Sequence, residues 1–112
     1  MILVVVPLSK DKVKDWCELS DKLKEKYSEK IKDMNLRYGL TKHCTWLLEE
    51  DSGARAIALY EGPGSEDFLP KLSKSDHEFD QWVKKKLEEI FDIDFSKKLD
   101  IPETKLLLNS GF

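Results

Sequence analysis

The chain has 112 residues, of which 19 are basic and 22 acidic, and its formal net charge is −3. This length is typical of one ordinary domain, so we expect residues 1–112 to fold as a single unit. The apolar share of 40% excludes a disordered chain, and the balance of charges excludes the basic excess of a nucleic-acid-binding protein. Composition therefore predicts a small, acidic, soluble domain.

The two cysteines, Cys17 and Cys44, are too few for a disulfide framework and do not have the spacing of metal ligands. We expect both to be small buried side chains in a reducing compartment, which favours a cytoplasmic protein. The apolar run Met1–Leu8 has only eight residues and no basic stretch before it. It predicts neither a signal peptide nor a membrane span, so no membrane partner is expected.

The first half of the chain predicts a strand and a long helix. Ile2–Val6 is β-branched without alternation, as in a strand that is buried on both faces. From Lys10 to about Tyr38, apolar residues recur every three or four positions, which is the pattern of a helix with one buried stripe. Ser9 is the expected N-cap, and Gly39 is expected to end the helix.

The second half predicts a hairpin and a second helix. Thr41–Glu50 and Ala54–Glu61 have the pattern of strands, and the sequence Asp51-Ser52-Gly53 between them is typical of a tight turn. The second helix is expected to run to about Phe91, and its start has the pattern of a capping box, with Ser75 at the N-cap and Glu78 three positions later.

A last strand, Thr104–Leu108, completes the predicted order β, α, β, β, α, β. This order favours an α+β ferredoxin-like fold, with a four-stranded antiparallel sheet and both helices on one face. The first and last strands, however, are apolar on both faces, at Val4–Val6 and Leu106–Leu108. Two helices leave one face uncovered, so we expect a homodimer in which two sheets pack face to face.

Three short segments resemble a known group of proteins: the helix start from Ser75 to Asp80 with Trp82 after it, the strand Trp46–Glu49, and the turn Asp51-Ser52-Gly53. Together with the element order, they resemble the dimeric α/β barrel proteins. This group includes antibiotic-biosynthesis-type monooxygenases, stress-responsive barrel proteins, EthD-like proteins and families of unknown function, and the segments look most like one of these uncharacterised families. The resemblance implies the fold and a homodimer, and it supplies no reaction.

The predicted hairpin register places Trp46 opposite Leu59 and Leu48 opposite Ile57, so that these four large apolar side chains share one face. The other face is smaller and partly polar, and carries His43, Thr45, Leu47, Ala56, Ala58 and Tyr60. This second face could form the floor of a small-molecule pocket, or its alanines could allow close packing of a helix or of a partner. The candidate ligand-binding residues are His43, Thr45, Tyr60 and Trp46.

His77 is the candidate catalytic residue, with Asp80 one turn along as its orienting partner and Tyr60 as a third group. The alternative is that His77 is a solvated residue at the helix start. With two histidines in the chain we expect no metal site, and without a glycine-rich phosphate-binding motif we expect no cofactor.

Two functions remain open. The chain could bind or transform a small, largely apolar molecule without a cofactor, or it could be a non-catalytic regulatory or protein-interaction dimer.

Overall fold

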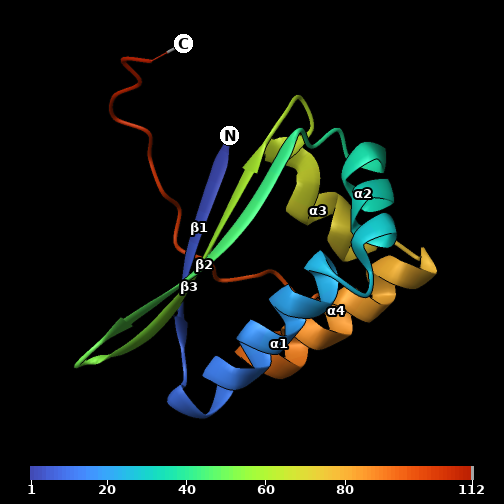
Figure 1. Cartoon of the computed structure of the whole chain (residues 1–112). Coiled ribbons are helices and arrows are strands. Elements are labelled where there is room, and N and C mark those ends of the chain that lie inside the picture. The colour runs from blue at the N-terminus through green and yellow to red at the C-terminus, as the bar shows by residue number, and fades with distance from the viewer. Residues whose placement is uncertain (112) are drawn as a thin grey trace.

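The computed structural model describes residues 1–111 and contains a three-stranded antiparallel sheet (Figure 1). Its strands are β1 (Ile2–Leu8), β2 (Lys42–Glu50) and β3 (Gly53–Glu61), in the order β1-β3-β2. The α+β class and the hairpin are therefore confirmed. The fourth strand is absent from the described residues, so the ferredoxin-like arrangement is not confirmed.

The hairpin between β2 and β3 has a two-residue turn, because Gly53 already pairs with Glu50. Trp46 consequently lies opposite Ile57, and the predicted register was wrong by two residues. A shift of two leaves every side chain on its predicted face, since side chains alternate with a period of two. Ala54, Ala56, Ala58 and Tyr60 are all buried and face the helices.

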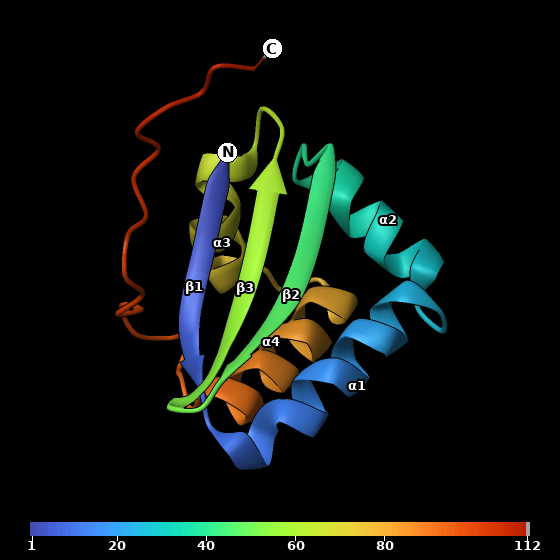
Figure 2. The same ribbon diagram turned by 60° about the vertical axis from the view of Figure 1, so that its left-hand side comes forward.

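The helical segments all lie on one side of the sheet (Figure 2). They are two 3-10 turns, Lys10–Lys12 and Ser65–Asp67, and four helices: α1 (Val13–Lys24), α2 (Ser28–Arg37), α3 (Phe68–Lys74) and α4 (Glu78–Phe91).

The predicted long helix is divided into α1 and α2, and the division follows from packing. The backbone leaves the helical path over residues 25–27, ending at Tyr27, whose φ and ψ are −111° and 26°. This turn brings the Tyr27 ring against the Trp82 and Phe79 rings of α4, at centroid distances of 4.8 and 6.2 Å. The predicted end at Gly39 is confirmed, since Gly39 has a φ of +67° and Leu40 N donates to Asn35 O at 2.8 Å.

The other side of the sheet is left uncovered by the helices. Between the buried residues of each strand lie apolar side chains that point away from the helices, and Leu3, Trp46 and Leu48 are 38, 47 and 38% exposed. We call this surface the open face; it consists of Leu3, Val5, Cys44, Trp46, Leu48, Ile57 and Leu59. Cys44 is half-buried there and Cys17 is exposed on α1, so the expectation that both are buried was wrong.

The C-terminal segment after α4 forms neither helix nor strand within the described residues. Its first part packs against the core through Phe95, which is buried, and through neighbouring apolar side chains. The segment then runs beside β1 (Figure 2), where the Thr104 hydroxyl donates to the Leu3 carbonyl at 2.6 Å. Leu106, Leu107 and Leu108 are 63, 92 and 77% exposed, because no other part of residues 1–111 covers them.

Candidate functional site

Two rings from neighbouring strands, His43 and Tyr60, lie side by side on the covered face of the sheet. The two residues are paired in the β2–β3 register, and their ring centroids are 4.8 Å apart. Phe68 at the beginning of α3 packs over both, at 6.2 Å from His43 and 4.7 Å from Tyr60. The structure thus brings together two of the predicted ligand-binding residues.

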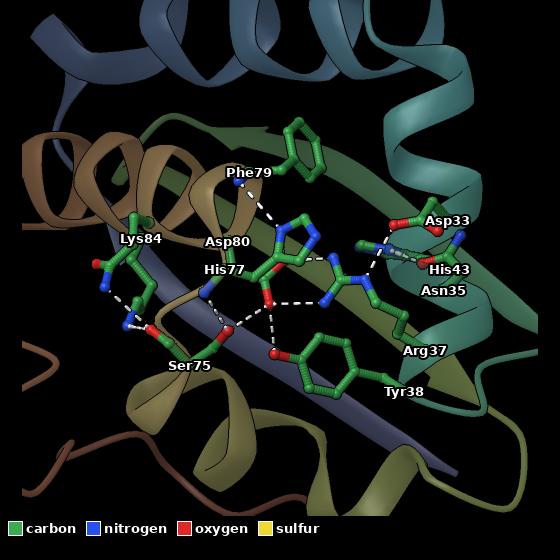
Figure 3. A network of polar contacts seen from close by, with 11 residues as sticks. Asp33, Asn35, Arg37, Tyr38, His43, Ser75, His77, Phe79, Asp80 and Lys84 are labelled. Atoms are coloured by element: carbon green, nitrogen blue, oxygen red, sulfur yellow. Dashed lines mark hydrogen bonds and ion pairs between the residues drawn. The ribbon is translucent and has the colours of Figure 1, made fainter.

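Burial keeps both rings uncharged at neutral pH, since it lowers the pKa of His43 to about 4 and raises the pKa of Tyr60 to about 12. His43 Nδ1 lies 3.2 Å from Asn35 Oδ1 (Figure 3). In the neutral ring, this contact favours the tautomer in which Nδ1 donates to the amide oxygen, so that Nε2 carries a lone pair that can accept a hydrogen bond.

A groove of about 380 Å³ opens beside His43, between α1, α2 and β2. The hydroxyl groups of Ser20 and Thr45 lie 3.2 Å apart in its wall, so Thr45 joins His43 as predicted. We call this the His43 groove; it is lined by Ser20, Asp21, Leu23, Lys24, Ile31, Asn35, His43 and Thr45.

A smaller cavity of about 40 Å³ lies behind the groove and shares His43 and Thr45 with it. Tyr60 and Phe68 line this inner cavity as well. A volume of this size holds a few water molecules or one end of a small ligand.

The cavity expected above the alanines is almost filled. Ala56 and Ala58 line a space of only about 60 Å³, which side chains of α4 and the C-terminal segment close, among them Leu87, Phe91 and Phe95. Ligand pockets usually measure about 300 Å³ or more. The alanines therefore allow close packing, which was the alternative interpretation.

Trp46 does not line the His43 groove or the inner cavity. Its side chain belongs to the open face, on the opposite side of the sheet. Only its backbone carbonyl contributes to the covered side, where it accepts a hydrogen bond of 3.1 Å from the Trp16 indole.

Asp80 forms the centre of a separate buried network (Figure 3), and its side chain is 0% exposed. Arg37 donates to both carboxylate oxygens at 3.0 and 2.8 Å, Tyr38 donates at 2.6 Å and Ser75 at 2.7 Å. Burial alone would raise the pKa of the carboxyl, but these hydrogen bonds outweigh it and lower the pKa to about 2. The network joins the end of α2 to the beginning of α4.

His77 is the N-cap of α4, where its Nδ1 accepts a hydrogen bond from Phe79 N at 3.3 Å. The capping box at Ser75 is therefore wrong by two residues. When the ring is neutral, Nδ1 has no proton to give to Asp80, whose nearest oxygen is 4.0 Å away. Asp80 accepts hydrogen bonds from Arg37 and makes none with His77.

The three predicted catalytic residues do not form one site. His77 lines a surface groove of about 430 Å³ with the rings of Tyr27 and Trp82. Tyr60 instead lines the cavities beside His43 and the alanines. The arrangement corresponds to the capping interpretation of His77.

Sequence reasoning missed Ser20, Asn35 and Arg37. Ser20 lies four residues after Trp16 on the buried stripe of α1, and a polar residue at that position signals a polar contact on the covered side. Asn35 and Arg37 lack such a signal, because their roles depend on how α2 turns after the break at Tyr27.

Within residues 1–111, no three histidine, cysteine or acidic side chains converge in a way that could hold a metal ion. No helix in the same range combines the length and the apolar character that crossing a bilayer requires. Comparisons with protein-family models, curated proteins and solved structures find no match, so they support no family for this chain.

Proposed function

We propose that the chain is a protein-interaction module that forms a homodimer through its open face. The observation that carries this proposal is an apolar surface on one side of a sheet whose other side is covered by the helices. Soluble monomers rarely expose apolar patches of more than a few hundred Å². Covering such a surface with a partner removes it from water, which is the main driving force for association.

A second copy is the partner that fits the shape and chemistry of the open face. Its central row, Val5, Ile57 and Trp46, is apolar across all three strands. A two-fold axis would place the same rows of two copies against each other, as self-complementary interfaces require. Two sheets then pack about 10 Å apart with interdigitating side chains.

The proposed dimer also gives the C-terminal segment a position beside β1. The Leu3 carbonyl that accepts from Thr104 points away from β3, so Leu3 and Val5 direct backbone groups toward the outer edge of β1. In the dimer, Thr104–Leu108 lies along this edge as the fourth strand. The assembly is then a pair of ferredoxin-like sheets, the fold that the element order favours.

Ile57→Lys tests the dimer, because it places a charge at the centre of the open face without touching the packed side. We expect the unmodified chain to have about twice the 13.0 kDa of one chain in light scattering at micromolar concentration, and Ile57→Lys to be a monomer. The matched control is Leu36→Lys on α2, where the leucine is 80% exposed on the helical side; it should remain a dimer. A monomeric unmodified chain would contradict the proposal.

A further inference from the structure

The His43 groove and the inner cavity behind it share part of their walls. Ser20, Leu23, Ile31, His43 and Thr45 line both spaces. Their volumes of about 380 and 40 Å³ together reach the lower part of the range of small-molecule pockets. The groove lies on the helical side of the sheet, so it is separate from the proposed dimer interface.

Two polar groups at the inner end have unused hydrogen-bonding capacity. Tyr60 is 8% exposed and lines the inner cavity. Its hydroxyl makes no side-chain hydrogen bond with any residue from 1 to 111 and keeps some contact with solvent, because no fully buried side-chain nitrogen or oxygen in this range lacks a partner. His43 uses one ring nitrogen on Asn35 and keeps the other as an acceptor. Both groups are therefore available to a polar partner from outside the chain.

The site has no net charge that would favour an ion. Its two buried rings are neutral at pH 7 for the reasons given above, and Asp21 and Lys24 at the rim are paired with each other at 3.8 Å. Leu23 and Ile31 supply apolar wall between the rim and the inner end. A bound molecule therefore needs an apolar body, and its inner end must be polar but uncharged.

We propose that the His43 groove binds an uncharged small molecule whose apolar body lies against Leu23 and Ile31 and whose carboxamide or hydroxyl end hydrogen-bonds with His43 and Tyr60. Such an end can donate to a ring nitrogen and accept from a phenol at the same time. A carboxylate of the same shape has no proton to donate and would lose its hydration without a compensating charge.

Benzamide is a suitable probe, since it joins a planar apolar ring to a primary carboxamide. Titration of the ¹⁵N-labelled full chain with benzamide should shift backbone amides at Ser20, Ile31, Asn35, His43 and Thr45, with a Kd on the order of 1 mM. Benzoate, the anionic counterpart, should shift them weakly or not at all at equal concentration. Shifts of equal size with benzoate would overturn the uncharged ligand class.

Tyr60→Phe removes only the hydroxyl, and because that group makes no side-chain hydrogen bond within residues 1–111 and is not cut off from solvent, the variant should fold. It should weaken benzamide binding by roughly threefold to tenfold, the value of one hydrogen bond. Tyr27→Phe is the matched control, since Tyr27 lines the groove beside His77 and not the His43 groove; it should leave the Kd unchanged. The proposal is overturned if benzamide shifts no residue of the His43 groove, or if Tyr60→Phe binds it as well as the unmodified chain does.

Discussion

The Asp80 carboxylate shows how one buried residue can hold two helices in place. Three donors from two other parts of the chain satisfy it, and they keep it ionised in spite of its burial. An ionised carboxylate without them would cost several kcal/mol to bury. Arg37, Tyr38 and Ser75 therefore position α2 and the loop before α4 relative to Asp80.

Asp80→Asn should lower the free energy of unfolding by about 2 kcal/mol, because Arg37 loses its anionic partner and one accepting oxygen is replaced by an NH2 group that cannot accept. Denaturant unfolding at pH 7 measures this loss. The control is Asp33→Asn, which removes an exposed carboxylate from the same guanidinium, at 2.9 Å, and should cost less than about 1 kcal/mol. Equal losses in the two variants would contradict the role assigned to Asp80.

The pH dependence has a definite sign. The pKa of Asp80 falls from 3.8 to about 2 on folding, so its stabilising effect is complete above pH 4 and is lost as the pH falls toward 2. The unmodified chain should therefore lose its advantage over Asp80→Asn in this range. An advantage that stayed constant from pH 7 to pH 2 would show that folding does not lower the pKa of this carboxyl.

Single residues at helix starts were the hardest to predict. The sequence from Ser75 to Glu78 matches a capping box, but the hydroxyl of Ser75 is engaged with Asp80 and His77 takes the capping position. Lys84 was equally unpredictable: it is 7% exposed, and its Nζ donates to the carbonyls of Ser73 and Ser75. Each of these roles depends on a partner that lies in another element, which local sequence does not specify.

At the scale of elements, the turn after α2 and the loop after β3 touch backbone to backbone. Gly64 N donates to Gly39 O at 3.2 Å, and a methyl group at Gly64 would overlap the Tyr38 carbonyl. Only glycine allows this approach. The contact also keeps Tyr38 beside Asp80.

Gly64→Ala should therefore lower the free energy of unfolding by about 1–3 kcal/mol, the usual cost of overpacking a close contact. Thermal or denaturant unfolding measures the change. Gly111→Ala is the control, since its methyl group would meet only the Asn109 side chain at 3.7 Å and should change stability by less than about 0.5 kcal/mol. If Gly64→Ala were as stable as this control, the two loops would not be in contact in solution.

The elements that were predicted correctly are those with a strict local period. Alternation in the hairpin assigned His43, Thr45, Ala56 and Tyr60 to one face even though the register was wrong by two, because a shift of two preserves the face. The long helix has an equally regular pattern, yet it breaks at Tyr27. That break is stabilised by aromatic contacts with α4, and no pattern within the segment itself signals it.

At the scale of the whole molecule, the open face and the C-terminal leucines both expose apolar side chains to water. Both are apolar, and within residues 1–111 the chain has no further element to cover them. The run of three consecutive leucines alone predicted Thr104–Leu108 as a strand, but a strand also needs a surface for its side chains and a neighbour for its backbone. β1 offers the backbone neighbour, and in the proposed dimer a second copy would offer the surface.

If the dimer completes the sheet, the amides of Lys105–Leu108 should be protected from hydrogen exchange only in the dimer. The leucine side chains gain burial against the partner's open face, which stabilises backbone hydrogen bonds to β1. We expect exchange at these amides to be slower by on the order of tenfold or more in the unmodified chain than in monomeric Ile57→Lys. Asn109–Gly111 lies beyond the strand and should exchange equally fast in both. Light scattering could show that the unmodified chain is a dimer while Lys105–Leu108 exchanges as fast in it as in Ile57→Lys. That result would exclude the fourth strand but not the dimer, because the open face can pair without this strand.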